Sequence, residues 1–320
     1  MATSSRLDER RPIPAYDESD LESTCSSLRM SIHEYVRDHG RSYHKYQEGK
    51  YLFPNDAAEQ DRYNIVHNMY LLALHGQLYL APVDDARNVL DIGTGTGIWA
   101  LEFADQHPDA QVLGNDLSSM QMQWVLPNCR FVVDDVEGDW IYEGQAPFDY
   151  IHQRSMCGSF GDWPRLFRQG YENLISGGWY EMQEMTVEME FADESDPNES
   201  DVSKWLKLLD EATEKVGRRL NCAADLEAMF RNAGFVEVQH EEVKIPFGRW
   251  PEETDQRTLG MFSLMSYVDG LEAISLAPFI HILGWTEREL KSFLHKVRRE
   301  CLEGQKQMYS RLHVVYGRKP

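Results

Sequence analysis

The feature that most constrains the fold is a glycine-rich turn between an apolar run and the start of a helix. The sequence of residues 88–100 is NVLDIGTGTGIWA, so three glycines alternate with threonines directly after the apolar run. Glycines at 93, 95 and 97 let the backbone turn tightly and approach a ligand closely. The free N–H groups at the start of the following helix then face polar ligand atoms. This pattern predicts a strand, a cofactor-binding turn and a helix, with a turn that binds no ligand as the alternative.

Two classes of nucleotide-like cofactor are compatible with this turn. Dinucleotide-binding enzymes carry Gly-x-Gly-x-x-Gly or Ala, and residues 95–100 satisfy that spacing. The register argues against a dinucleotide, because the strand ends near Ile92 and a frame that opens at Gly93 meets Ile98 where Gly or Ala is required. A pyrophosphate would also lie unfavourably near the carboxylate of Asp91, which would instead stabilise an amino group and a sulfonium cation. S-adenosylmethionine therefore fits better than NAD.

Strand-like and helix-like segments alternate after the turn, as in a mostly parallel sheet with helices on both faces. We predict a Rossmann-like α/β fold with seven strands at residues 89–92, 111–115, 130–133, 148–151, 178–182, 236–245 and 312–316. Helices are expected at about 98–107, 163–176 and 222–233. A long helical pattern at residues 250–302, before the last strand, predicts an insertion that forms a lid or a substrate wall.

The N-terminal part divides into a tail and a cap. Residues 1–25 are polar and rich in Ser, Asp and Glu, so we expect a disordered tail. Apolar residues then recur at helical spacing, first at positions 28, 32 and 35 and again at 65, 69 and 72. This predicts a helical cap over residues 26–82, followed by the α/β domain over residues 83–320.

Ligands of open α/β sheets bind beyond the carboxyl ends of the strands, so polar residues there are candidate contacts. Asp116 follows the second strand and is placed to accept hydrogen bonds from ribose hydroxyls, with helix capping as the alternative. Asp135 and Val136 follow the third strand and are candidates to bind adenine, although the same residues could simply lead into a loop. Thr94 and Leu117, beside the turn and Asp116, complete the predicted cofactor site.

Two residues after later strands are candidates for catalysis. His152 would act as a general base toward an oxygen or nitrogen nucleophile, because imidazole titrates near neutral pH; the alternative is a packed histidine. Glu184 would orient a substrate amine or hydroxyl, with a solvated acid as the alternative. Displacement at a sulfonium depends mainly on alignment and desolvation, so methyl transfer does not require a strong base.

Composition argues against several function classes. The formal net charge of −21 disfavours direct nucleic-acid binding and binding to anionic membranes. The five cysteines are scattered without a Cys-x-x-Cys pair, so we expect a reducing compartment, no disulfides and no metal site. No apolar run approaches the roughly 20 residues that span a bilayer, and the polar N-terminus is unlike a secretory signal. We therefore expect a cytoplasmic protein.

The chain resembles the fungal LaeA-like methyltransferases over nearly its whole length after residue 25. The resemblance is carried by the turn, by DDVE followed by Trp140, and by residues 40–44 (GRSYH), 51–56 (YLFPND), 177–181 (GGWYE) and 315–319 (VYGRK). It implies a class I methyltransferase fold that uses S-adenosylmethionine. It also marks Tyr43 and Tyr51 as contacts to cofactor or substrate, with core packing as the alternative.

The resemblance leaves two functions open. The family commonly has prolines after the second strand, where residues 116–122 of this chain are DLSSMQM, so the loop near the cofactor can differ in shape. Some members resemble nuclear regulators of secondary metabolism that act with velvet-type partners, and others are pathway enzymes. We predict an enzyme that methylates an oxygen or nitrogen of a small secondary metabolite. The alternative is a regulator that acts through velvet-type partners, in which case the nucleus is the expected compartment.

Overall fold

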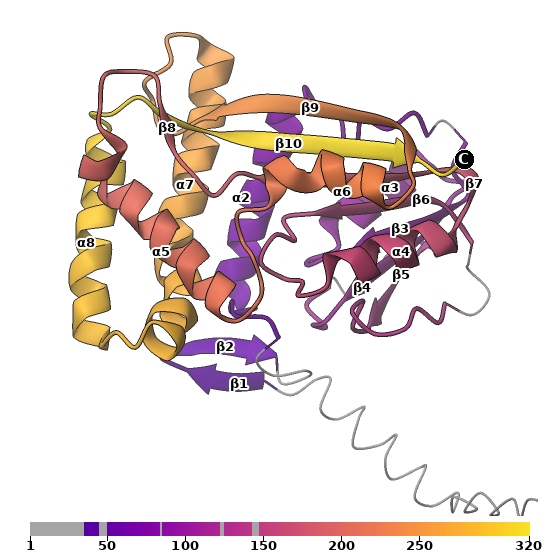
Figure 1. The fold of residues 1–320 in the computed structure, drawn as a ribbon, viewed down its shortest axis with the longest axis horizontal. Helices are drawn as coiled ribbons and strands as arrows, with labels where there is room; N and C mark the ends of the chain where they lie inside the picture. The colour runs from indigo at the N-terminus through magenta and orange to yellow at the C-terminus, as the bar shows by residue number, and fades with distance from the viewer. Residues whose placement is uncertain (1–34, 45–49, 84, 122–124, 143–146) are drawn as a thin grey trace, which may run out of the picture.

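The computed structural model describes residues 35–44, 50–83, 85–121, 125–142 and 147–320 (Figure 1). The predicted tail, residues 1–25, and the first part of the predicted cap up to residue 34 lie outside these residues. One sheet runs through the centre, and the helices of the insertion gather beyond one end of it (Figure 1). No helix in the described part of the chain has both the length and the hydropathy that a membrane span requires.

The central sheet contains eight strands, and their order is β5-β4-β3-β6-β7-β10-β8, with β9 paired to β10. Strands β5, β4, β3, β6 and β7 are parallel, whereas β10 is antiparallel to β7, β8 and β9. The bounds are β3 (Asn88–Ile92), β4 (Gln111–Asp116), β5 (Cys129–Val133), β6 (Phe148–Arg154), β7 (Leu174–Met185), β8 (Glu190–Phe191), β9 (Val236–Pro246) and β10 (Met308–Arg318). All seven predicted strands are present, which confirms the Rossmann-like α/β fold.

Helices cover both faces of the sheet because successive side chains of a strand point to opposite faces. Val89 packs with Trp99 and Phe103 of α3 on one face. The next residue, Leu90, packs on the other face with Phe167 of α4 and with α6. The bounds of the flanking helices are α3 (Ile98–Gln106), α4 (Trp163–Asn173), the 3₁₀ turn η2 (Ala223–Asp225) and α6 (Leu226–Asn232).

The sequence pattern predicts a cap that is helical throughout, but the structure of the cap is only partly helical. Strands β1 (Tyr35–Asp38) and β2 (Arg41–His44) form an antiparallel hairpin, so the helix predicted around residue 35 is wrong there. His39 and Gly40 have φ angles of 47° and 81°, the left-handed conformation that a two-residue hairpin turn requires. Helix α2 (Ala57–Ala73) follows, and the side chain of Asp56 caps its first turn.

The insertion is helical, as predicted, and builds a second hydrophobic core. It contains α7 (Thr254–Leu276), the π-helical turn η3 (Ala277–Ile282) and α8 (Glu287–Glu303). These elements pack with α5 (Asp201–Lys215), an unpredicted helix preceded by the 3₁₀ turn η1 (Pro197–Glu199). Helix α7 also packs along α2, so the insertion and the cap meet beside the sheet (Figure 1).

Candidate active site

A cleft opens where the carboxyl ends of β5, β4, β3 and β6 meet, and we call it the strand-end cleft. It contains about 980 Å³ of space that is partly open to solvent. Its lining includes residues 93–96, 115–118, 134–137 and 154–156, with Tyr51, Tyr63 and Val66 from the cap. The structure therefore brings the residues after the first four predicted strands together along one edge of the sheet.

The glycine turn adopts the register that the sequence indicated. Strand β3 ends at Ile92, and the three glycines that follow all have positive φ. A Cβ at Gly93 would lie 2.1 Å from the sulfur of Met156, and one at Gly97 would lie 2.4 Å from the ring of Phe131. Gly97 does not line the cleft, so glycine is needed there for packing under the turn rather than for direct ligand contact.

Asp91 and His152 form a buried pair beneath the turn instead of facing the cleft. They are opposite each other on β3 and β6, and Nδ1 of His152 lies 2.8 Å from a carboxylate oxygen of Asp91. The hydroxyl of Thr94 donates to the other oxygen of Asp91 at 2.6 Å. The ring of His152 is fully buried and stacks on Trp99 with centroids 3.7 Å apart.

This geometry counts against two sequence predictions. Asp91 orders the turn through Thr94, and its buried side chain is not part of the cleft lining. His152 is not positioned as a general base for the same reason, and burial lowers the pKa of its imidazole. The physical cause is that β6 runs to Arg154 rather than ending at residue 151, so the residue leaving the strand is Ser155.

Asp116 lies at the end of β4 and lines the cleft, as predicted. One carboxylate oxygen accepts from the backbone N–H of Gly95 at 2.8 Å, and the other accepts from the N–H and hydroxyl of Ser118. Asp116 therefore joins the glycine turn to the following loop and presents its carboxylate beside the turn. Leu117 also lines the cleft at this point.

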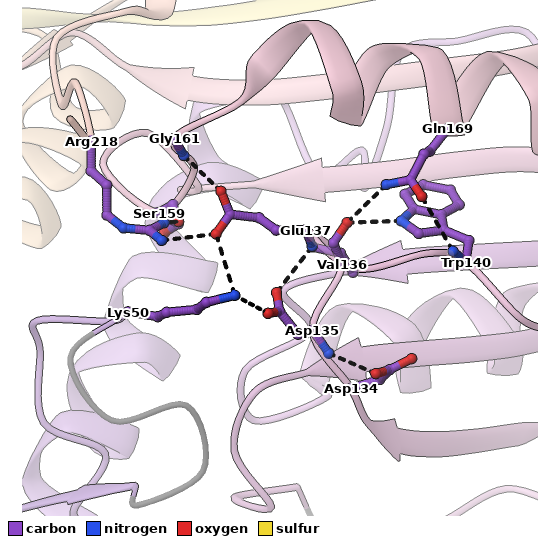
Figure 2. Close-up of polar contacts among 10 residues, drawn as sticks. All are labelled: Lys50, Asp134, Asp135, Val136, Glu137, Trp140, Ser159, Gly161, Gln169 and Arg218. Atoms are coloured by element: carbon purple, nitrogen blue, oxygen red, sulfur yellow. Dashed lines mark hydrogen bonds and ion pairs between the residues drawn. The ribbon is translucent and has the colours of Figure 1, made fainter. Parts of the chain in front are cut away.

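Asp135 and Val136 line the next part of the cleft, where Lys50 of the cap reaches the carboxylate of Asp135 (Figure 2). The other oxygen of Asp135 accepts from the backbone N–H of Glu137 at 3.0 Å. An adenine amino group would therefore compete with Lys50 for the carboxylate of Asp135. The carbonyl of Val136 accepts from the indole of Trp140 at 2.9 Å, which fixes this loop.

Glu137 is a lining residue that sequence reasoning did not select. Its carboxylate accepts from the N–H of Gly161 at 2.7 Å and from the guanidinium of Arg218 at 2.8 Å (Figure 2). The partners come from sequence positions far from residue 137, so no local pattern could have revealed them. The motif DDVE at residues 134–137, which carries part of the family resemblance, is the sequence signal for this position.

A second pocket adjoins the strand-end cleft, and we call it the aromatic pocket. The two share Tyr51, Tyr63, Val66 and Ser155. The aromatic pocket contains about 940 Å³ of partly open space, and its aromatic lining consists of Tyr51, Phe53, Tyr63, Tyr70, Trp205 and Tyr267. Helices α2, α5 and α7 supply most of this lining, so residues of the insertion form part of a wall beside the cleft.

Ser155 marks the junction of the two pockets. It is one of few non-glycine residues with positive φ, at 55°, and its hydroxyl lies 2.9 Å from that of Tyr70. Strained backbone of this kind persists where the surrounding contacts hold it, often at functional positions. Tyr51, a predicted contact, lines both pockets, and its hydroxyl lies 2.7 Å from that of Tyr63. Tyr43, the other predicted tyrosine, lines neither pocket.

Glu184 lies in the wall of the aromatic pocket and is not a solvated acid. Its side chain is buried, and its carboxylate accepts from the backbone N–H groups of Met156 and Cys157 at 2.7–3.0 Å. Burial raises the pKa of this carboxyl to about 7, although the backbone donors oppose the shift. A group with this pKa can accept or release a proton at neutral pH.

Comparison with known proteins gives matches along most of the chain. A family model described as a methyltransferase domain matches residues 65–240. The sequence is 42% identical over 303 residues to the methyltransferase pytC of Aspergillus terreus, covering 94% of this chain and 93% of that protein.

Two further relatives carry other descriptions. The secondary metabolism regulator LAE1 of Cochliobolus heterostrophus is 34% identical over 290 residues, covering 88% of this chain and 94% of that protein. The protein-methionine methyltransferase laeA of Emericella nidulans is 32% identical over 301 residues, covering 92% of this chain and 78% of that protein. The described functions therefore differ among proteins that align with nearly the same part of the chain.

Proposed function

Because the chain belongs to the LaeA-like family of S-adenosylmethionine-dependent methyltransferases, we propose that it methylates an oxygen or nitrogen of a small secondary metabolite. Bound S-adenosylmethionine supplies an electrophilic methyl group on a sulfonium sulfur. The proposed chemistry requires that the protein hold this group in line with the nucleophile and exclude water. The strand-end cleft and the aromatic pocket together fit these two tasks.

The strand-end cleft fits the cofactor. Gly93 lines the cleft and has no side chain of its own, so a ligand can approach its backbone closely. The carboxylate of Asp116 beside the turn suits two ribose hydroxyls, and residues 135–136 offer a place for adenine. Because β5, β4 and β3 lie side by side in this order, adenine, ribose and the methionine part would follow the same order along the cleft.

The aromatic pocket carries the proposal of a small acceptor, because it opens into the cleft at Ser155 and Tyr63. An apolar and aromatic lining with few polar groups is typical of sites for small organic ligands. Rings such as Tyr70, Trp205 and Tyr267 suit a flat, largely apolar acceptor. We propose that this acceptor lies in the aromatic pocket with its nucleophile directed at the junction.

Glu184 would accept the proton that the acceptor loses. The pKa of its carboxyl is raised to about 7, so the group is partly ionised at neutral pH. Glu184 also lines the aromatic pocket. Hydrogen bonds from the N–H groups of Met156 and Cys157 hold the ionised form in place next to Ser155. Proton transfer to a positioned carboxylate of this kind contributes to rate mainly when the nucleophile is a hydroxyl or a protonated amine.

The test uses the full chain, S-adenosylmethionine with a deuterated methyl group, and a panel of aromatic hydroxyl and amine metabolites. Mass spectrometry should detect labelled methyl in an acceptor together with equimolar S-adenosylhomocysteine. Glu184→Gln should lower kcat, whereas Glu188→Gln, an exposed acid on the following loop, should not. Tight binding of S-adenosylmethionine with no labelled acceptor across the panel would count against a pathway enzyme of this type.

A second candidate function is regulation through velvet-type protein partners. Its support is the similarity to relatives described as secondary metabolism regulators, such as LAE1. In that role the chain would act in the nucleus rather than in the cytoplasm. Stoichiometric co-purification with a velvet-type partner, together with no turnover of small acceptors, would favour this function over the enzyme.

A further inference from the structure

Arg154 has an unusual position in the strand-end cleft. It is the last residue of β6 and lines the cleft directly beside Ser155. Among the described residues that line this cleft it is the only basic one, whereas four lining residues carry carboxylates: Asp116, Asp134, Asp135 and Glu137. The chain as a whole has a net charge of −21, so a cation here is not part of a general basic surface.

The guanidinium of Arg154 has no carboxylate partner among the residues that the structure describes. Its Nη2 lies 2.8 Å from Nδ1 of His67, and its Cζ lies 5.4 Å from the ring centroid of Tyr70. Arginine can only donate, so Nδ1 of His67 must be the acceptor. Nε2 of the same imidazole then carries the proton and lies 3.1 Å from the carboxylate of Glu102.

His67 cannot neutralise this charge. Burial and the nearby Arg154 lower the pKa of the His67 imidazole to about 3, so the ring is neutral at physiological pH. Glu102 lies beside the far nitrogen of this ring and makes no direct contact with the guanidinium. Asp91 and Glu102 attract the desolvated guanidinium from a distance, but neither forms an ion pair with it. A desolvated guanidinium without a directly paired carboxylate is costly, and an anionic group in the cleft would reduce that cost.

The strand order says which part of a ligand would meet Arg154. Strands β5, β4, β3 and β6 lie side by side in this order, with Asp135 after β5, Asp116 after β4 and the glycine turn after β3. If adenine lies at Asp135 and ribose at Asp116, the amino-acid end of the cofactor points to β6. The one anionic group of S-adenosylmethionine is the carboxylate at that end.

We propose that Arg154 binds the α-carboxylate of S-adenosylmethionine, and that His67 is a positioning residue that holds the guanidinium toward the cleft. This inference rests on the proposed cofactor. A carboxylate on the acceptor is the other source of the same chemistry. Arg154 lines the strand-end cleft but not the aromatic pocket, so the cofactor is the favoured source.

The experiment compares two ligands that differ only in the carboxylate. Calorimetry on the full chain measures Kd for S-adenosylmethionine and for decarboxylated S-adenosylmethionine. The wild-type protein should prefer the carboxylated ligand by about 10- to 100-fold, as expected for a charge-assisted bidentate contact. Arg154→Met should reduce this preference to less than about 3-fold and leave the Kd for the decarboxylated ligand nearly unchanged.

Two further variants separate binding from folding. Arg165→Met removes an exposed arginine of α4 and should keep the wild-type preference. His67→Leu should reduce the preference severalfold without changing the Kd for the decarboxylated ligand, which a merely structural defect would not do. Arg154→Lys, which keeps a positive charge, should retain part of the preference if Arg154→Met fails to fold.

Several results would overturn the proposal. One is a wild-type protein that binds both ligands equally, and this result needs no variant. Another is equal weakening of both ligands by Arg154→Met. If that variant binds both ligands like the wild type and instead raises KM for an acidic acceptor, the acceptor is the source of the carboxylate. If the wild-type protein binds neither ligand, the proposed cofactor itself is refuted.

Discussion

Replacing Gly97 by alanine should destabilise the protein by about 2–5 kcal/mol, and two separate effects contribute. Gly97 has φ of +82°, a conformation that costs an alanine about 1–2 kcal/mol. A Cβ at this position would also lie 2.4 Å from the ring of Phe131, so the ring would have to move. Overpacking of this kind typically costs about 1–3 kcal/mol.

Gly95 provides the matched control, because its φ is +56° but the nearest atom to a Cβ there is the carbonyl oxygen of Gly93 at 4.0 Å. Gly95→Ala should therefore cost only the conformational part, about 1–2 kcal/mol. Urea unfolding without cofactor, followed by tryptophan fluorescence, gives the free energy of unfolding for each variant. In a Phe131→Leu background, Gly97→Ala should cost about as little as Gly95→Ala. Equal costs for the two single variants would refute the packing argument.

Residues of the site allow further tests. Asp116→Ala should weaken binding of S-adenosylmethionine by about 1–3 kcal/mol through lost ribose hydrogen bonds, and an unchanged Kd in calorimetry would contradict that contact. The kcat of the wild-type enzyme should rise with pH through about 7 as Glu184 ionises, and Glu184→Gln should lack this rising limb. Because the pKa of Glu184 in the folded protein lies above its ordinary value of 4.5, the folded state binds this proton more tightly than the unfolded chain. The contribution of Glu184 to stability therefore falls as pH rises from about 4.5 to about 7, and Glu184→Gln should flatten that part of a urea-stability profile. Tyr267→Ala should raise the acceptor KM roughly 10-fold through lost ring packing in the aromatic pocket. If Tyr267→Ala also raised the Kd for S-adenosylmethionine by a similar factor, the variant would not act on acceptor binding alone. His152→Phe should lower stability by about 1–3 kcal/mol, because the buried Asp91 loses a partner, and should leave the pH profile of kcat unchanged. A shift in the pH profile of kcat would instead support His152 as the general base.

The strands and the glycine turn were predictable because their signals are local. Apolar runs bounded by turn residues gave all seven main strands, and the positions of residues 93–97 set the register of the turn. The end of β6 was misplaced because polar residues after Ile151 look like a loop. They remain in the strand, where His152 pairs with Asp91 and the side-chain oxygen of Gln153 accepts from Tyr180 at 2.7 Å. The three additional strand residues place Arg154, rather than a residue next to His152, at the end of β6.

Local patterns in the sequence indicate two other elements. His39 and Gly40 suit a hairpin turn, and this turn overrides the helical spacing that precedes it. Helix α5 has the helical repeat Val202, Trp205 and Leu209, and it begins after the N-cap residue Ser200. Both were available from local patterns alone.

The aromatic pocket could not be predicted in this way. Tyr51, Trp205 and Tyr267 line one pocket only because the cap, α5 and the insertion pack together. The contact of Lys50 with Asp135 likewise joins residues 85 positions apart. The pKa of Glu184 depends on burial by these same elements, and a single sequence gives no measure of that burial.

A crystal structure of the full chain with bound S-adenosylhomocysteine would show directly whether the two pockets divide cofactor and acceptor between them. We expect adenine beside Val136, ribose hydroxyls on Asp116, and the sulfur at Ser155 facing the aromatic pocket. A reversed ligand with its amino-acid end at Asp135, or a sulfur atom separated from the aromatic pocket, would contradict the proposed function.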